Sequence, residues 1–372
     1  MKKVTRITSI CFTALLLVPL ATSFFTNKNK VASEDKIAFP KLNENFFSNL
    51  SKYLEQQFYF RPEIIEANKT LDNILLKEQN ALIQSQLSKI FGDDYLEPVI
   101  VNNAIYGRDD WLFYSGDNSV DFYCGTNLPT NDELELESNK LLRLKQACAD
   151  KGINLVVLAC PNKEQVYSEY MPSYVIKNEY KRLPRIRDYM VSKGINYIYP
   201  LQELLDAKQE GLVYYKQDTH WNARGAYIGY KEVMNSIGRT IDEPSFIELE
   251  KTGGDLSNMC GFQTTYEDAG ATYSNNPDYN YIINADTAHT INESGSNKIY
   301  IVSDSFRTAL QPYAFRDFNE VFSLHRSTME SKESIDFLNR MSSGDTLLIQ
   351  FVERYESCVT SVSDNILSTW AK

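Results

Sequence analysis

The chain of 372 residues has no excess of basic residues, no low-complexity tract and no internal repeat. Its 38 Lys and Arg residues are outnumbered by 49 Asp and Glu residues, and the net charge is −11. A nucleic-acid binder needs a basic face that displaces counterions from phosphates, so this balance argues against nucleic acid as a partner. Hydrophobic residues make up 43% of the chain and charged residues 23%, which excludes disordered and collagen-like chains. At roughly 150 residues per domain, the length predicts about two domains, or one large domain with an appendage.

Cysteine and histidine are also scarce. None of the six Cys residues forms a CxxC pair or has the spacing of a zinc site, and one of them, Cys11, lies in an apolar run. The other five are an odd number, so at least one thiol stays unpaired within the chain. Three His residues are present, His220, His289 and His325, so a general base of this type has few candidates. We expect His289 to be exposed and His325 to be structural.

The first 26 residues are typical of an export or anchor segment. Three basic residues precede an apolar run over residues 7–25, which approaches the ~20 residues that span a bilayer. No small-x-small cleavage site follows, because Phe24 and Phe25 stand where small residues are needed. An uncleaved anchor is favoured over a cleaved signal peptide, and a buried helix is the third alternative. Either of the first two places the rest of the chain outside the cytoplasm.

The rest of the chain divides into a polar linker (27–42), a helical segment (43–98) and an α/β domain (99–372). In this last part, predicted helices alternate with short apolar strands. The run 154–160 is apolar almost throughout, which predicts a strand buried on both faces. The alternation predicts a mainly parallel sheet with helices on both faces and with its chemistry at the carboxyl ends of the strands. The predicted helices are 131–150, 178–193 and 223–237, and the other predicted strands are 195–199, 298–302, 320–324 and 346–351.

Asp218 and His220 are the first candidates for catalysis. They lie two residues apart in the segment DTHW, just before the helix predicted from residue 223. An extended segment places both side chains on one face, where the carboxylate can orient the imidazole and stabilise its charged form. The alternatives are a helix N-cap Asp beside a solvent-facing His, and a metal site for which no third ligand is evident nearby.

The next candidate is Ser305, at a predicted turn from strand to helix. The strand 298–302 runs straight into the segment SDSF, and an apparent helix follows. A serine in this position projects from the edge of the sheet, while the first N–H groups of the helix face an oxyanion. Serine needs a base to be nucleophilic at neutral pH, and His220 with Asp218 supplies one. The alternative is that Ser303 or Ser305 caps the helix.

Together these segments resemble the SGNH-hydrolase-like polysaccharide O-acetyltransferases, for which the alginate O-acetyltransferases of the DHHW type are the reference. The resemblance runs in one order from about residue 43 to residue 355, and it implies a circularly permuted, flavodoxin-like α/β fold. It assigns the nucleophile to Ser305, the general base to His220 and the orienting acid to Asp218. Ser303 stands where that family usually has Gly, and a positive φ there would strain the turn. The other segments that carry the likeness are GRDDWLF (107–113), PNK (161–163) with Tyr167, GAY (225–227), GDL (254–256) and ERY (353–355).

Three further residues are candidates for binding the substrate or the oxyanion. Asn162 follows a predicted buried strand, so it either offers an amide to the oxyanion or forms a turn after Pro161. Arg326 follows another predicted strand and either contacts a sugar carboxylate or is solvated. Trp221 either stacks on a sugar ring or fills the core beside His220.

The sequence therefore predicts a membrane-anchored, extracytoplasmic O-acetyltransferase. It moves an acetyl group through a Ser305 acyl-enzyme to hydroxyls of a cell-surface or exported polysaccharide. The resemblance implies a polysaccharide acceptor and a multi-pass membrane acyltransferase as acetyl donor, and it implies no metal or other cofactor. One alternative is an SGNH-type carbohydrate acetylesterase with the same three residues, which differs in water access and acceptor binding. Another is a catalytically silent polysaccharide-binding or assembly protein that keeps the fold.

Overall fold

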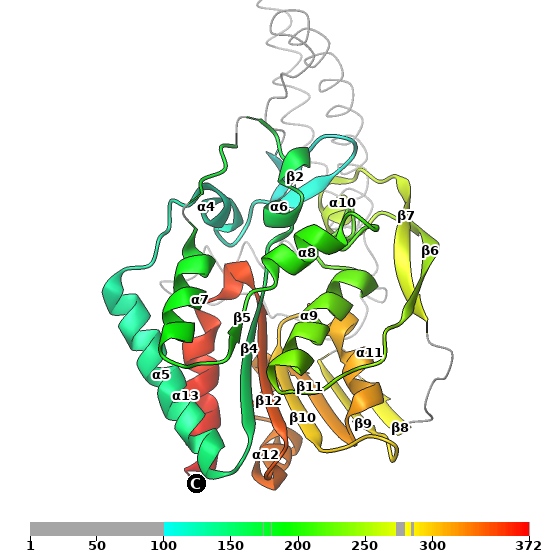
Figure 1. Cartoon of the computed structure of the whole chain (residues 1–372). Coiled ribbons are helices and arrows are strands. Elements are labelled where there is room, and N and C mark those ends of the chain that lie inside the picture. The colour runs from blue at the N-terminus through cyan, green and yellow to red at the C-terminus, as the bar shows by residue number, and fades with distance from the viewer. Residues whose placement is uncertain (1–99, 174, 180, 273–279, 284–285, 372) are drawn as a thin grey trace, which may run out of the picture. The chain divides into compact units, whose positions relative to one another are not determined.

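The computed structural model describes residues 100–371, apart from residues 174, 180, 273–279 and 284–285 (Figure 1). All of the described residues belong to one compact unit, which lies within Asn80–Lys372. Within the described part of the chain, no helix is both long and apolar enough to cross a membrane.

The three N-terminal segments defined above lie outside the described residues. They are the predicted anchor (1–26), the linker (27–42) and the helical segment (43–98). All three therefore stay predictions, and the fold concerns the α/β domain alone.

A seven-stranded sheet forms the centre of this domain (Figure 1). Five of its strands are parallel, and the last two continue one edge in antiparallel pairing. The predicted mainly parallel sheet is therefore confirmed. In spatial order the strands are β5 (Tyr197–Ile198), β4 (Asn154–Cys160), β12 (Thr346–Val352), β10 (Lys298–Ser303), β11 (Glu320–His325), β9 (Thr287–Ile291) and β8 (Asn280–Ile283).

The order of the parallel strands shows the predicted circular permutation. When the strands are counted from β10, and the count returns to β4 after β12, the spatial order is 2-1-3-4-5. This is the flavodoxin-like order. When they are counted from β4, which comes first in the chain, the order becomes 2-1-5-3-4. Strand β10, which leads to Ser305, is therefore the first strand of the flavodoxin-like order, although it is the third of the five parallel strands along the chain.

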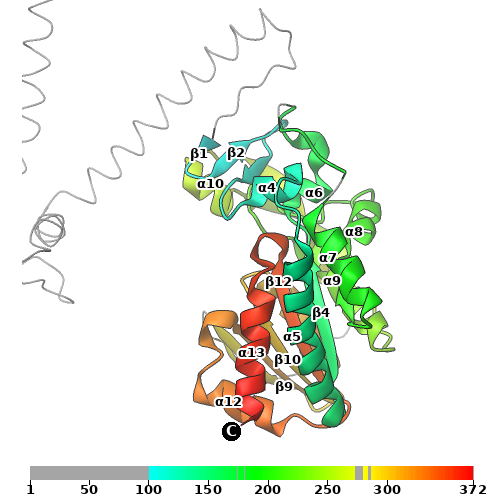
Figure 2. The same ribbon diagram turned by 90° about the vertical axis from the view of Figure 1, so that its left-hand side faces the viewer.

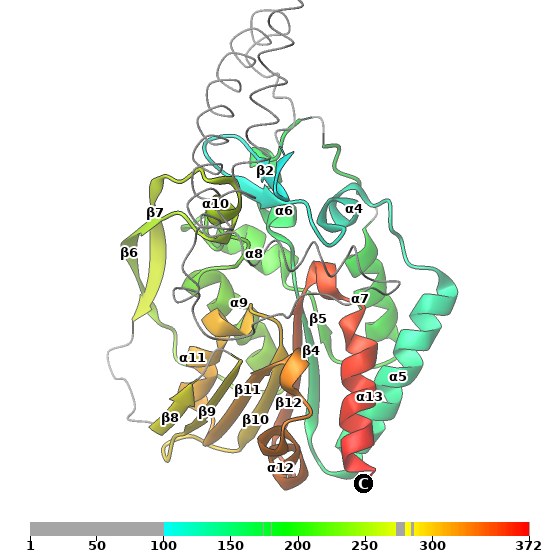
Figure 3. The ribbon, with the colours of Figure 1, turned by 180° about the vertical axis from the view of Figure 1, so that it is seen from behind.

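The sheet separates two cores. On β10, Ile299 and Ile301 belong to one core and Tyr300 and Val302 to the other, as the two-residue period of a strand requires. Because both faces are buried, the central strands are continuous apolar runs rather than alternating ones. Helices α8 (Leu201–Ala207), α9 (Ala223–Ser236) and α11 (Arg307–Asp317) cover the first core (Figure 1). Helices α5 (Asn131–Asp150), α7 (Arg182–Ser192), α12 (Lys332–Arg340) and α13 (Cys358–Trp370) cover the second (Figure 3), where α5 and α13 lie side by side (Figure 2).

The structure confirms the predicted bounds of one helix, α5, and moves the start of another, α7. Helix α5 has the predicted bounds, and Thr130 and Glu133 form a capping box at its start. Helix α7 begins at Arg182 rather than at residue 178, because Lys181 keeps an extended backbone and its ammonium group donates to the carbonyl oxygen of Tyr123. The antiparallel strands β8 and β9, and the separate two-stranded sheet of β6 (Ser245–Thr252) and β7 (Thr265–Thr272), were not predicted.

Short elements gather at the carboxyl ends of the parallel strands (Figure 1). They surround the position of the candidate site and include a short strand with two aromatic residues, Phe113 and Tyr114. The five Cys residues of the described part all have free thiols. The short elements are β1 (Ile100–Val101), β2 (Ala104–Tyr106), β3 (Leu112–Tyr114), α4 (Ser119–Cys124), α6 (Lys163–Val166) and α10 (Asp255–Cys260).

Candidate active site

Ser305 lies in the turn between β10 and α11, as predicted. The neighbouring Asp304 is buried and fixes this turn, because its carboxylate accepts hydrogen bonds from the backbone N–H groups of Phe306 (2.9 Å) and Val352 (2.7 Å). The second of these bonds joins the turn to the end of β12. Ser305 itself is exposed. Ser303 is not among the described residues with positive φ, so serine in place of the usual glycine causes no backbone strain there.

His220 lies between Ser305 and Asp218. Its Nε2 atom is 2.6 Å from Ser305 Oγ, and its Nδ1 atom is 2.6 Å from Asp218 Oδ1. The backbone N–H of His220 also donates to Asp218 Oδ1, at 3.0 Å. The segment ends at Asn222, whose side chain caps α9 by accepting a hydrogen bond from the backbone N–H of Gly225. The structure thus brings together the three residues that the sequence singled out.

The environment of Asp218 favours its ionised form. Burial alone would raise its pKa, but the hydrogen bonds and the charge of His220 outweigh burial. The backbone N–H of Asp255 adds a third donor, 3.0 Å from Asp218 Oδ2. The net effect is a pKa of Asp218 well below its usual range. This carboxylate therefore stays charged at neutral pH and faces the imidazole.

Asn162 follows β4 and is fully buried. Its backbone N–H donates to Glu353 at 2.9 Å, and its side-chain oxygen accepts from Arg354 at 3.3 Å. The amide nitrogen Nδ2 is buried and has no hydrogen-bond partner within the described structure. A buried donor without a partner is rare in folded proteins, which keeps Asn162 Nδ2 a candidate donor to the oxyanion.

Trp221 belongs to the core, and the sugar-stacking alternative is wrong for this structure. Its side chain is 0% exposed, and its indole Nε1 donates to the carbonyl oxygen of Phe306 at 2.9 Å. Helix α9 packs directly on the indole through Gly229, where a Cβ atom would lie 2.7 Å from the ring. The ring therefore has no free face for a sugar.

The remaining candidates lie near the ends of β11 and on β9. Arg326 is half-buried and stacks on Tyr355, with its guanidinium carbon 4.7 Å from the ring centre. Together with His325 it lines a cavity of about 330 Å³. His325 caps a short 3₁₀ helix and is structural, as expected. His289 is half-buried and pairs with Glu320 at 2.9 Å, so the expectation of an exposed side chain was wrong.

Two buried or half-buried charged residues were missed as parts of this site. Asp255 accepts hydrogen bonds from the backbone N–H (2.7 Å) and the hydroxyl (2.5 Å) of Thr219, and its Oδ2 atom lies 3.6 Å from His220 Nδ1. Lys163 contacts the same segment from another side. Both residues lie in the segments GDL and PNK, which carry the family resemblance, and this was the signal that could have found them.

One group of residues in the described structure could hold a metal ion, and it consists of Asp218, His220 and Asp255. One ligand atom of each residue lies within 4.8 Å of the others. These atoms already take part in hydrogen bonds with one another and with Thr219. An ion would have to displace the bond between Asp218 and His220. The arrangement therefore suits proton transfer better than metal binding.

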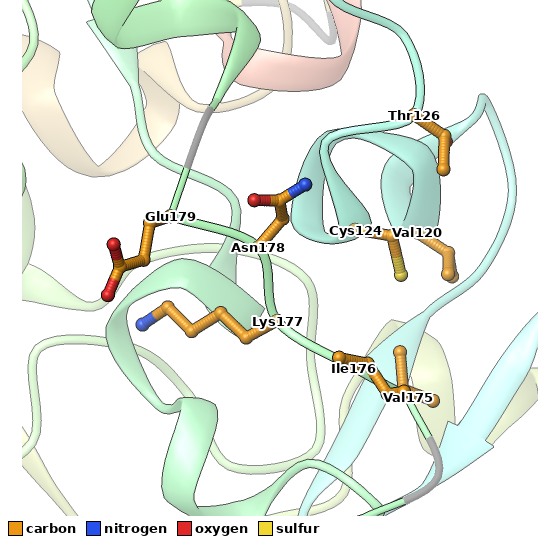
Figure 4. Close-up of a pocket in the computed structure, with 8 residues that line it drawn as sticks. All are labelled: Val120, Cys124, Thr126, Val175, Ile176, Lys177, Asn178 and Glu179. Carbon is orange, nitrogen blue, oxygen red and sulfur yellow. The ribbon is translucent and has the colours of Figure 1, made fainter.

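A separate cavity of about 790 Å³ opens between α4 and the chain before α7 (Figure 4). None of Asp218, His220 and Ser305 lines it, so no part of the site belongs to it. Its lining residues are Val120, Cys124, Thr126, Val175, Ile176, Lys177, Asn178 and Glu179.

Residues 104–320, more than half of the chain, match the family model described as the SGNH hydrolase-like domain of acetyltransferase AlgX. The chain belongs to this family. The matched range includes Asp218, His220 and Ser305. It confirms the family that the sequence resembles and, with the strand order above, its SGNH-hydrolase-like α/β fold.

Two curated relatives are similar over part of their length. The "Probable alginate O-acetylase AlgJ" of Pseudomonas putida is 26% identical over 171 residues, which are 42% of this chain and 41% of that protein. The protein of the same name from Pseudomonas fluorescens is 30% identical over 143 residues, which are 36% of this chain and 33% of that protein. The chain thus matches less than half the length of either relative.

Solved structures similar to this one include the O-acetyltransferase domain of Pseudomonas putida AlgJ. It is 16% identical with a TM-score of 0.44, and the similarity covers 70% of this chain and 99% of that one. A DHHW family protein from Eubacterium siraeum is 14% identical with a TM-score of 0.48, covering 73% of this chain and 97% of that one.

Proposed function

We propose that this protein transfers an acetyl group, through an acyl-enzyme on Ser305, to hydroxyl groups of a polysaccharide. The observation that carries the proposal is the line of hydrogen bonds from Ser305 to His220 and from His220 to Asp218, each 2.6 Å long. Membership of an acetyltransferase family supports acetyl as the group that moves. The alginate O-acetylase relatives support a polysaccharide as the acceptor.

In the first half of the reaction, His220 Nε2 takes the proton of Ser305 Oγ as this oxygen attacks the acetyl carbonyl carbon of the donor. A tetrahedral intermediate forms, and the ionised Asp218 stabilises the imidazolium through Nδ1. When the bond to the donor oxygen breaks, His220 gives its proton to the leaving group. The product is an acetyl ester on Ser305.

In the second half, a sugar hydroxyl attacks the acetyl ester while His220 Nε2 takes the hydroxyl proton. The bond to Ser305 Oγ then breaks, and this oxygen takes the proton back from His220. The oxyanion of each tetrahedral intermediate needs donors, and removal of one donor typically costs roughly 10²–10³ in rate. The unpartnered Nδ2 of Asn162 and the backbone N–H of Ser305 are the donors that we assign to it.

The proposal extends to the surroundings of the enzyme. Arg326, at the end of β11, would contact a carboxylate of an acidic sugar. The basic and apolar residues at positions 1–26 would hold the domain outside the cytoplasm, beside a multi-pass membrane acyltransferase that supplies the acetyl group. Neither partner is needed for the first chemical step on Ser305 if a small activated ester replaces the donor.

The test is the intact mass of the purified protein after brief exposure to a chromogenic acetyl ester. One added acetyl group is expected on the native protein and on Ser303→Ala, which removes the buried serine at the end of β10. No acetyl group is expected on Ser305→Ala. Equal labelling of the native protein and Ser305→Ala would contradict the proposal.

Acceptor sugars then separate transfer from hydrolysis. A transferase should release the acetyl group faster when an acidic oligosaccharide is added, and the sugar should gain the acetyl mass. Release at an unchanged rate, with free acetate as the product, would instead show an acetylesterase. A native protein that forms no adduct and turns over no ester would show that the fold has been kept without this activity.

A further inference from the structure

Lys163 is a buried lysine that the mechanism above does not use. It is the first residue of α6, and 2% of its surface is exposed. Its ammonium group donates hydrogen bonds to the backbone carbonyl oxygens of Tyr215 (3.2 Å), Lys216 (3.2 Å) and Asp218 (2.7 Å). An ammonium group has three N–H donors, so all three are directed at one short segment of the chain.

The surroundings of this ammonium group make it unusual. The rings of Trp111 and Phe113 lie 5.7 Å and 5.3 Å from it, so aromatic faces complete its shell. Burial lowers the pKa of Lys163 to about 7, and the negative charges of Asp218 and Asp255 oppose this shift. Burying a charge costs free energy, and a methionine would fill the same space without that cost. The position therefore points to a task for the charge itself.

From this arrangement we propose that Lys163 is a positioning residue, whose ammonium group fixes the backbone of residues 215–218 and thereby orients Asp218 toward His220. The inference rests on the proposed function, because it gives Lys163 a part in the same acyl transfer. Asp218 is held at both ends, since Lys163 binds its carbonyl oxygen and the N–H of Asp255 binds its carboxylate. A misplacement of about 1 Å in such a group can lower a rate about 10²-fold.

The charge of Lys163 also has a consequence for pH dependence. A neutral amine has two N–H donors, so it cannot hold three carbonyl oxygens. The charged groups that act on Lys163 are Asp218 in the segment that it binds, Asp255 on α10, Glu164 beside it on α6, and Arg354 after β12. As the pH rises above about 7, Lys163 loses its proton, and we expect the rate of Ser305 acetylation to fall.

The experiment compares three variants of the full chain with the native protein. Lys163→Met removes the donors and keeps an unbranched side chain, while Lys163→Arg keeps a charge at every pH, since the pKa of arginine is above about 12. Lys181→Met is the matched control, because Lys181 is also buried and also donates to a carbonyl oxygen, that of Tyr123. The measurements are the rate of Ser305 acetylation between pH 5 and 10 and the proton NMR resonance of His220 Nδ1–H.

We expect Lys163→Met to acetylate Ser305 about 10- to 100-fold more slowly at pH 7, with no further fall at alkaline pH. Lys163→Arg should recover part of the rate and also lack the alkaline fall. The hydrogen-bonded Nδ1–H resonance should be lost or broadened in Lys163→Met and kept in Lys181→Met.

A folded Lys163→Met variant with the native rate, pH profile and resonance would overturn the inference. If Lys163→Met does not fold, the test depends on Lys163→Arg. An acetylation rate that falls at alkaline pH in Lys163→Arg as it does in the native protein would equally overturn the inference. Should the native protein form no adduct at all, the proposed function fails. The resonance in the folded variants then still shows whether Lys163 orients Asp218.

Discussion

The indole Nε1 of Trp221 donates a hydrogen bond to the carbonyl oxygen of Phe306 across 2.9 Å. These residues directly follow His220 and Ser305, which lie 85 residues apart in the chain. The ring of Phe306 also packs on the imidazole of His220, with ring centres 5.0 Å apart. One buried contact thus joins the base-bearing segment to the nucleophile-bearing turn, and it helps to set the distance between Nε2 and Oγ.

Trp221→Phe should therefore slow the acetylation of Ser305 about 10-fold with little change in the ester concentration needed for half-maximal rate. The variant loses the hydrogen bond and leaves a buried carbonyl oxygen without its donor, at a cost of about 1–3 kcal/mol. Stopped-flow kinetics with a chromogenic ester measures both quantities. The matched control is Trp370→Phe, which removes an indole hydrogen bond to the carbonyl oxygen of Leu338. Trp370 is the last residue of α13, far along the chain from Trp221. A rate loss as large in Trp370→Phe would mean that the effect is general instability.

Asp218→Asn should lower the acetylation rate about 10⁴-fold, because an amide favours the wrong imidazole tautomer and cannot stabilise the imidazolium. The expected geometry is unchanged, since Asn has the same shape and Lys163 still holds the backbone. The measurement is single-turnover acetylation followed by intact mass. Asp317→Asn removes a carboxylate that accepts from Tyr230 instead, and it should keep the native rate. A rate of Asp218→Asn within 10-fold of the native rate would remove Asp218 from the mechanism.

Asn162→Ala should lower the rate about 10²–10³-fold, since it removes the unpartnered amide assigned to the oxyanion. The variant also loses the hydrogen bond that the side-chain oxygen of Asn162 accepts from Arg354, so the melting temperature should fall together with the rate. Asn292→Ala is the contrasting variant, because its amide donates to the carbonyl oxygens of Phe315 and Arg316 and is structural. It should lower stability and leave the rate alone. The assignment fails if Asn162→Ala behaves in the same way as Asn292→Ala.

Much of the fold could be predicted because its central strands are buried on both faces. The run 154–160 is apolar almost throughout and became β4, and the run 346–351 became most of β12. Strand β9, with the sequence TAHTI, carries no such signal, since it exists through its antiparallel pairing with β11 and β8. Long-range pairing of this kind cannot be read from local hydrophobicity.

The residues of the site likewise divide into those that the sequence pattern predicts and those that depend on long-range packing. Asp218 and His220 are close in sequence and Ser305 ends an apolar strand, so local pattern and family resemblance predicted all three. Lys163 could not be found from local pattern, because its contacts reach residues 52 to 55 positions away and depend on the packing of α6 against the segment before α9. For the same reason the sequence left open whether Trp221 stacks on a sugar or fills the core. The close approach of Gly229 to the indole ring shows that Trp221 fills the core.

Glu353 lies at the end of β12 and is 0% exposed. Burial raises its pKa to about 8, although the backbone N–H of Asn162 and the hydroxyl of Tyr199 donate to it. The folded protein therefore keeps a proton on this group between about pH 4.5 and 8, where the unfolded chain has released it. The folded state binds more protons in this window, so the free energy of unfolding must fall as the pH rises through it.

Glu353→Gln removes this titration, so the variant should gain stability relative to the native protein between pH 5 and pH 8.5. A change on the order of a few kcal/mol is expected, because one pKa unit corresponds to about 1.4 kcal/mol. Urea unfolding at several pH values measures it, since the other buried acids remain in both proteins and cancel in the difference. The matched control is Glu333→Gln, which makes the same substitution at an exposed glutamate of α12. A difference for Glu353→Gln that stays constant over this pH range would show that Glu353 is ionised in the folded protein, where Asn162, Gln165 and Tyr199 donate to it.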